Sequence, residues 1–370
     1  MFAYFYYKHT NDLYAMYIKN YMFKNMNYFL VKRSTNMFKK IYFLILVLLS
    51  QTSHSYPAQS ELFGLSNSMV QVFVTFKGGV TGTGSGIVIK ENHVATNCHV
   101  FADSDGVNVV KFYETYTPIS VYADWENDLC ILKFDNLPLS PVKLRSAEEL
   151  SYEEKVFSLT FPNDNPMPLP SYGKVKALYP FHKGNIIRSS AGFTVGSSGG
   201  ALFDLDFNLV GITTFKSPGR RENYYYCLPV DWIKELLKTK EQMNLKSKAA
   251  PFWSLPENKK PFFMRIVLPM QNEDWQLMLK IAKSWTQADD ESADAWYYLG
   301  FVHKKMANLD FAKLFLKQAV KLNSKHYDSL IVLAEIAVIQ KNTDEYNHAI
   351  KLMSRIDDVS AKFYLENNPI

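Results

Sequence analysis

Residues 60–230 contain short apolar runs separated by turn residues, and this pattern constrains the fold more than any other feature of the chain. Val70, Val72 and Val74 alternate with residues of a second face, which is the period of a β-strand. Further runs of this kind lie at residues 109–113, 129–134, 155–161 and 210–215. Because no helical pattern interleaves with them, the region is predicted to be an all-β barrel or sandwich.

The hydrophobic pattern becomes helical at residue 231. Residues 231–238 predict a short helix capped by Asp231. The next residues are rich in Lys and Asn and contain three prolines, a composition typical of linkers. The chain therefore divides into an all-β domain at residues 60–240, a linker at 241–271 and an all-α domain at 272–370.

The all-α domain carries an internal repeat. A shift of 34 residues places Leu299 on Leu333 and Gly300 on Ala334, so large and small residues mostly coincide. This pattern resembles tetratricopeptide repeats. The resemblance implies a concave surface that binds a protein partner. A plain helical bundle is the alternative interpretation.

The start of the chain predicts export. Residues 37–55 combine two lysines, the apolar run 41–49 and a small-x-small sequence ending at Ser55, as a secretory signal does. The apolar run is too short to span a bilayer, so no stable membrane span is expected. A short buried helix or a retained anchor is the alternative. Because a signal normally begins a chain, residues 1–36 are interpreted as a misassigned extension upstream of Met37, and the protein as periplasmic or secreted.

Charge and cysteine content exclude other classes. Seven of the 41 basic residues and one of the 36 acidic residues lie in residues 1–56, so the rest of the chain is nearly neutral and nucleic-acid binding is not expected. Three cysteines without Cys-x-x-Cys or paired-His spacing disfavour a metal site. The glycines at 82–86 lack the lysine and the following helix of a nucleotide loop. No cofactor is expected.

Three segments carry groups that together suit nucleophilic catalysis. They are residues 96–100 (TNCHV), 127–132 (NDLCIL) and 196–202 (GSSGGAL), all within the all-β region. A serine hydroxyl needs a neighbouring base at neutral pH, and His99 has the intrinsic chemistry for that role. Asp128 would hold the imidazole in the right tautomer beside Ser198. Gly196 would let the amides of residues 196 and 198 point at one developing oxyanion.

These segments resemble the trypsin-like, chymotrypsin-fold serine peptidases. Residues 84–89 (GSGIVI) and 227–230 (CLPV) are most similar to the bacterial HtrA/Deg branch. The resemblance implies a double β-barrel and an endopeptidase with a protein or peptide substrate. It implies His99 as base, Asp128 as orienting acid and Ser198 as nucleophile, with the Gly196 and Ser198 amides as oxyanion hole.

The resemblance also suggests a substrate site. Gly192 takes the place of the pocket floor, and Thr213, Thr214 and Phe215 take the place of the strand that pairs with the substrate backbone. Since no acid lies at the floor, we expect a small or medium apolar side chain to be preferred. Ser197 replaces the aspartate of the digestive members, so activation by a freed N-terminus is not expected.

Cys98 and Cys130 flank the predicted base and acid. If His99 and Asp128 meet, the two sulfur atoms fall within disulfide range, and two buried free thiols are the alternative.

The alternative to an enzyme is a catalytically inactive protease-fold binding or adaptor protein. An α/β-hydrolase is disfavoured because the serine comes last in the order and helices do not alternate with strands.

Overall fold

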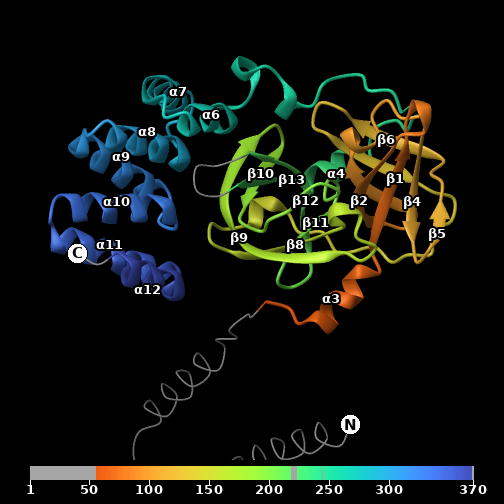
Figure 1. Ribbon diagram of the computed structural model, residues 1–370, viewed down its shortest axis with the longest axis horizontal. Coiled ribbons are helices and arrows are strands. Elements are labelled where there is room, and N and C mark those ends of the chain that lie inside the picture. Colours follow the sequence, from red (N-terminus) through yellow and green to blue (C-terminus); the bar gives the residue numbers. More distant parts are fainter. Residues whose placement is uncertain (1–55, 218–222, 244, 369–370) are drawn as a thin grey trace, which may run out of the picture. The chain divides into compact units, whose positions relative to one another are not determined.

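The computed structural model describes residues 56–217, 223–243 and 245–368 of the 370-residue chain. The predicted signal at residues 37–55 and the extension at 1–36 lie outside the described residues. Helix α3 (Gln59–Ser66) precedes the first strand (Figure 1). Within the described part of the chain, every helix is too short or too polar to cross a membrane.

The first β-structure is an antiparallel sheet of seven strands in the order β5-β4-β1-β2-β3-β7-β6. Its apolar face packs around the alternating valines of β1, so the period seen in the sequence places them in a core. The strands are β1 (Met69–Thr75), β2 (Thr81–Lys90), β3 (His93–Asn97), β4 (Gly106–Lys111), β5 (Glu114–Tyr116), β6 (Ser120–Asp124) and β7 (Leu129–Lys133).

The second β-structure is a closed barrel of six strands in the order β10-β13-β12-β11-β8-β9. The first sheet has two edge strands, β5 and β6, and among the described residues it is not closed by a strand pair between them. The double barrel that the resemblance implies therefore stays a prediction. The barrel strands are β8 (Lys155–Thr160), β9 (Leu169–Phe181), β10 (Gly184–Ser189), β11 (Ala201–Asp204), β12 (Leu209–Ser217) and β13 (Tyr224–Pro229).

The described residues after β13 form helices and the segments that connect them. Short helix α4 (Asp231–Leu236) follows the barrel, but the residue at its N-cap is Val230, so the prediction of an Asp231 cap is wrong. The Asp231 carboxylate instead accepts the backbone N–H of Ala147, a distant partner. The remaining helices are α5 (Phe262–Arg265), α6 (Val267–Gln271), α7 (Trp275–Ala288), α8 (Ala293–Lys305), α9 (Leu309–Leu322), α10 (Tyr327–Ile339), α11 (Thr343–Ile356) and α12 (Asp358–Asn367).

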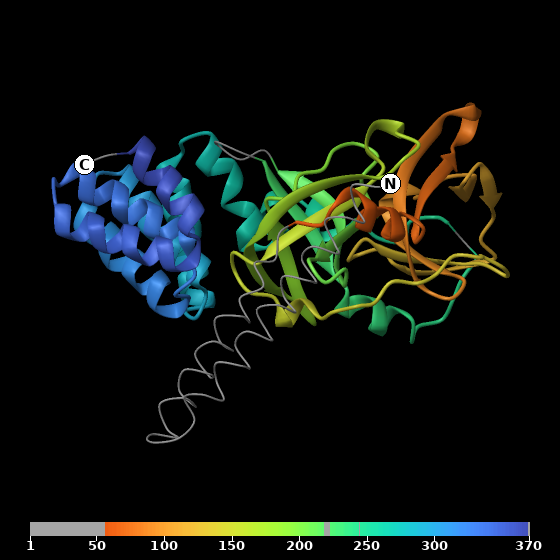
Figure 2. The ribbon, with the colours of Figure 1, turned by 90° about the horizontal axis from the view of Figure 1, so that it is seen from below.

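Helices α7 to α12 pack each on the next (Figure 2). Helix α10 begins 34 residues after α8, and α11 begins 34 residues after α9, with equal lengths within each pair. A side chain at Gly300 would come within 2.7 Å of Leu316, which explains the small residue on α8 where α9 approaches. The spacing agrees with the 34-residue shift, while the assignment to tetratricopeptide repeats stays a prediction.

The helical region packs on the six-stranded barrel through one continuous core. Tyr179 of β9 stacks on Phe263 of α5 with ring centroids 4.3 Å apart. The buried guanidinium of Arg188 on β10 donates to the Asp328 carboxylate of α10 at 3.1 Å and to the Tyr298 hydroxyl of α8 at 3.2 Å. These contacts fix the helices to the barrel with both apolar and polar groups.

Asp357 makes a further ionic contact between the helices and the barrel. Burial raises the pKa of its carboxyl, but Lys174 of β9 and Ser360, which donate to the carboxylate, outweigh burial and lower the pKa from 3.8 to about 2. Between about pH 2 and 3.8, the Asp357 carboxyl is therefore charged in the folded state and protonated in the unfolded state. This contribution is complete above about pH 4 and is lost as the pH falls toward 2.

We expect the Asp357→Asn variant to lose about 2 kcal/mol of unfolding free energy at pH 7. The deficit should shrink as the pH falls below 4, and urea unfolding at several pH values measures it. Asparagine can still cap α12, so the change isolates the charge. The matched control is Asp358→Asn, because exposed Asp358 pairs with its neighbour Lys362 along α12. A deficit that did not depend on pH would contradict the ionic account.

Candidate active site

His99 and Asp128 lie together at the edge of the sheet where β3 ends and β7 begins. His99 lies in the 3-10 helix η2 (Cys98–Val100) that follows β3, and Asp128 directly precedes β7. The His99 backbone N–H donates to Asp128 Oδ1 at 2.8 Å, and His99 Nδ1 lies 2.6 Å from Asp128 Oδ2. The Asp128 side chain is 1% exposed, so its carboxylate can hold the ring at Nδ1 and leave Nε2 as the free base.

Strand pairing and a disulfide hold these two residues together. Thr96 pairs with Cys130 across β3 and β7, which fixes the register of the two loops. Cys98 and Cys130 form a disulfide with Cα atoms 5.0 Å apart. The Asn97 amide donates to the Asp128 carbonyl at 2.9 Å and to Thr214 Oγ1 of the barrel at 3.0 Å. His99 and Asp128 are therefore anchored to β12, the strand whose Thr214 carbonyl contacts Ser198.

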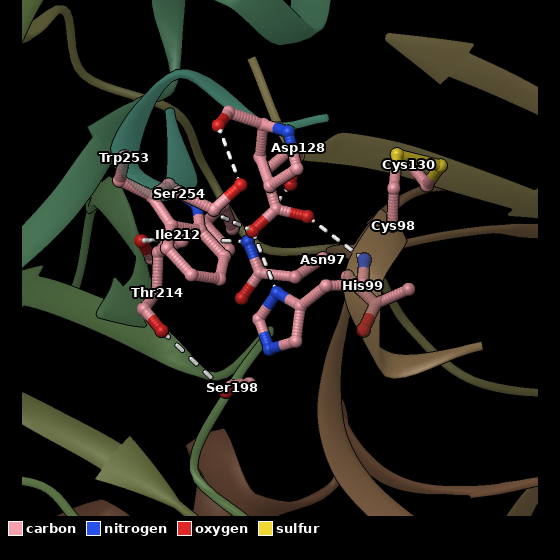
Figure 3. A network of polar contacts seen from close by, with 12 residues as sticks. Asn97, Cys98, His99, Asp128, Cys130, Ser198, Ile212, Thr214, Trp253 and Ser254 are labelled. Carbon is pink, nitrogen blue, oxygen red and sulfur yellow. Dashed lines mark hydrogen bonds and ion pairs between the residues drawn. A yellow bond between two sulfur atoms is a disulfide. The ribbon is translucent and has the colours of Figure 1, made fainter. Parts of the chain in front are cut away.

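Ser198 lies in the loop between β10 and β11, on the side of the imidazole that carries Nε2 (Figure 3). Its hydroxyl donates to the Thr214 carbonyl at 3.4 Å. Within the part of the chain that the structure describes, no hydrogen bond joins Ser198 Oγ to His99 Nε2. Catalytic hydrogen bonds are often long or poorly aligned without substrate, and another χ1 rotamer of the serine would give its hydroxyl a different partner.

The loop leaves two backbone donors for an anion. Among the described residues, the N–H groups of Gly196 and Ser198 donate to no other group. The Val195 carbonyl accepts the Asn163 N–H at 2.8 Å, and a trans peptide points its C=O and N–H in opposite directions. This bond therefore holds the Gly196 N–H away from Asn163. Gly196 has φ +85°, a conformation that glycine adopts at little cost.

Ser85 on β2 holds the loop in place. Its hydroxyl donates to the Gly196 carbonyl at 2.9 Å and accepts the Phe161 N–H at 2.9 Å, while its N–H donates to the Ser198 carbonyl at 2.8 Å. Ser85 is fully buried, so these bonds are shielded from water. Sequence reasoning did not assign it a role, although a serine between Gly84 and Gly86 in a buried strand is a usable signal.

The predicted substrate-binding residues differ in their contacts with the Ser198 loop. A Cβ atom added at Gly192 would lie 3.3 Å from the Tyr225 ring, so an aromatic side chain lies beside the predicted pocket floor. Thr213 is buried, and its hydroxyl donates to the Ser197 carbonyl at 2.6 Å, which supports the loop. Thr214 contacts Ser198 through its carbonyl. Phe215 of β12 is half-buried and stacks on Tyr226, with centroids 4.7 Å apart.

Trp253 is a residue of the site that the linker composition concealed. Its indole Nε1 donates to Asp128 Oδ2 at 3.0 Å (Figure 3).

The remaining cysteine, Cys227, is buried, and burial raises the pKa of its thiol, which makes it a poor nucleophile. Across the described ranges, no cluster of three His, Cys, Asp or Glu side chains could hold a metal ion.

Comparisons with known proteins connect this geometry to a family. Residues 84–212 match the family described as a trypsin-like peptidase domain. Protease Do-like 1, chloroplastic, of Arabidopsis thaliana is 27% identical over 171 residues, which cover 41% of this chain and 38% of that protein. Serine endoprotease DegS of Haemophilus influenzae is 26% identical over 195 residues, which cover 49% of this chain and 57% of DegS.

Solved structures of proteases also match, although distantly. The Rv3671c protease from M. tuberculosis in its active form has a TM-score of 0.46 at 19% identity, covering 52% of this chain and 92% of that chain. The chain spans less than two thirds of the length of the Arabidopsis and Haemophilus relatives. The family match covers His99, Asp128 and Ser198 together with the loops that hold them. Residues 84–212 of this chain are thus similar to a trypsin-like peptidase domain.

Proposed function

We propose that the protein is a serine endopeptidase that cleaves peptide bonds of proteins through an acyl-enzyme on Ser198. The observation that carries this proposal is the pairing of His99 Nδ1 with the buried Asp128 carboxylate at 2.6 Å, with Ser198 on the other side of the imidazole (Figure 3). A purely structural histidine does not need a buried carboxylate on one nitrogen and a free second nitrogen beside a serine.

In the proposed reaction, Ser198 Oγ attacks the scissile carbonyl carbon while His99 Nε2 takes the hydroxyl proton. The carbonyl oxygen becomes an oxyanion and accepts the N–H groups of Gly196 and Ser198. The C–N bond then breaks, and His99 gives its proton to the leaving amine. A water molecule attacks the resulting ester with His99 again as base, which releases the acid and restores Ser198.

Substrate selection is proposed to depend on the predicted pocket floor at Gly192. Tyr225 packs against Phe193, with ring centroids 5.1 Å apart, so two aromatic side chains lie close to Gly192. A small or medium apolar side chain fits such a pocket. Thr214 and Phe215 lie on the strand that would pair with the substrate backbone.

Export and an interaction role for the helices complete the proposal. The disulfide between Cys98 and Cys130 supports export, since disulfides persist in oxidising compartments such as the periplasm and the extracellular space. A groove of about 300 Å³ lies among α9, α10 and α11, and Leu333 and His348 are part of its lining. We assign this groove to a protein partner or to a segment of the substrate.

Cleavage of an unfolded protein substrate tests the proposed activity. We expect the wild type to release peptides and Ser198→Ala to lose nearly all of this activity. The matched control is Ser284→Ala on α7, a serine in the helical region, which should retain it. Cleavage by Ser198→Ala at the wild-type rate would contradict the proposal. A folded wild type without cleavage would favour the inactive binding or adaptor protein.

A further inference from the structure

A segment that follows the barrel returns to the active site. Residues Phe252–Ser254 form the 3-10 helix η5, and the Phe252 N–H donates to the Glu126 carbonyl at 2.8 Å, two residues before Asp128. The Phe252 side chain is 5% exposed and packs on Phe181 with centroids 4.7 Å apart. Because a buried ring and a backbone hydrogen bond fix Phe252, the next residue, Trp253, has a defined place.

Trp253 contacts both members of the base–acid pair. Its Nε1 lies 3.0 Å from Asp128 Oδ2, the same oxygen that His99 Nδ1 approaches. Its ring meets the His99 ring edge-on, with centroids 5.4 Å apart at 83°, and stacks on Phe215 at 5.8 Å. The indole therefore touches the histidine with its ring and the carboxylate with its N–H.

The hydroxyl of Thr214, which contacts Asn97, does not supply this donor. Thr214 Oγ1 donates to the Ile212 carbonyl at 2.9 Å and accepts the Asn97 amide. Asp128 Oδ1 is occupied by the His99 backbone N–H. Indole nitrogen can only donate, and a charged acceptor makes its hydrogen bond stronger than a neutral one. Trp253 thus fills the second position on Oδ2 that no other described side chain fills.

We propose that Trp253 is a positioning residue of the His99–Asp128 pair, acting through an indole hydrogen bond to Asp128 Oδ2 and edge contact with His99. Under this assignment, the segment 251–254 is part of the active site although it lies outside both β-structures. The proposal rests on the proposed peptidase function for its effect on rate. The hydrogen bond itself has a readout that does not require activity.

The test compares Trp253→Phe with Trp296→Phe. Phenylalanine keeps an aromatic ring but removes the donor. Trp296 of α8 also donates through its indole, to the Asp290 carbonyl at 2.7 Å, so Trp296→Phe is the matched loss of an indole donor in the helical region. We expect Trp253→Phe to lower kcat/KM for a short peptide about tenfold, the size of one hydrogen bond to a charged group. Trp296→Phe should leave it unchanged.

Two readouts separate positioning from packing. With one donor removed, Asp128 holds the protonated imidazole more strongly, so the acid limb of the kcat/KM profile should move to higher pH in Trp253→Phe. The low-field proton resonance of His99 Nδ1–H should move further downfield, because one oxygen no longer shares two donors. If Trp253→Phe folds poorly, the Trp253 indole resonance in Asp128→Ala gives the same information, since it should shift while that of Trp296 does not.

Each outcome decides between the proposals. An unchanged pH profile and an unchanged Nδ1–H resonance in folded Trp253→Phe would overturn the positioning role, even if wild-type cleavage is normal. A wild type that cleaves nothing would remove the proposed function. In that case the resonance shifts of His99 and Trp253 would still support or overturn the hydrogen bond.

Discussion

Replacing Asp128 by asparagine is expected to lower kcat about 10⁴-fold, the size of the same change in the trypsin template. Asp128 Oδ1 accepts the backbone N–H of His99, and Asp128 Oδ2 lies beside the ring nitrogen Nδ1 of His99. An asparagine that keeps the first bond presents its NH₂ group to Nδ1. The ring must then carry its proton on Nε2, where it can no longer take the proton of Ser198.

Peptide hydrolysis by purified Asp128→Asn measures this effect, with urea unfolding to show that the fold is retained. The matched control is Asp135→Asn, an exposed carboxylate just beyond the other end of β7, which should keep the wild-type rate. A tenfold loss or less in Asp128→Asn would mean that the carboxylate does not set the tautomer of His99.

Replacing Gly199 by alanine is expected to destabilise the protein by more than about 4 kcal/mol and to abolish activity. A Cβ atom there would lie 2.2 Å from both the Ser85 carbonyl oxygen and Thr96 Oγ1. The position cannot shift freely, because the Gly199 N–H donates to the Thr213 carbonyl at 2.8 Å. Its φ of +84° adds a second penalty for any residue with a Cβ.

Urea unfolding of Gly199→Ala beside Gly78→Ala separates the two penalties. Gly78 has φ +81° but nothing within 4 Å of its Cβ position, so its substitution should cost only about 1–2 kcal/mol. If both variants lost the same stability, the packing of the Ser198 loop against Ser85 and Thr96 would be contradicted.

Local patterns in the sequence were sufficient to predict that His99 and Asp128 lie together. The motifs around His99, Asp128 and Ser198 each join a polar group to a strand end, and pairing of β3 with β7 brings the first two together. The same pairing brings Cys98 and Cys130 within bonding distance, as their positions beside His99 and Asp128 suggested. The alternation of apolar residues predicted strands because burial on one face has period two.

Contacts between distant segments could not be read in this way. Asp231 resembled a helix cap, yet its carboxylate bonds to Ala147, which no local pattern reveals. Trp253 lies in a proline-rich stretch that is typical of a linker, and only the three-dimensional path of the chain places it on Asp128. Arg188 is a charged residue buried against α8 and α10, a position that depends on how the helices pack on the barrel.

The most direct test of the central claim is reaction of the purified protein with a fluorophosphonate, followed by mass mapping of the adduct. An activated serine beside a free imidazole nitrogen and an oxyanion hole is required for rapid phosphonylation. The account predicts a single adduct on Ser198, absent from His99→Ala and retained in Ser284→Ala. A folded wild type that forms no adduct, or forms it on another serine, would contradict the assignment of Ser198 as nucleophile.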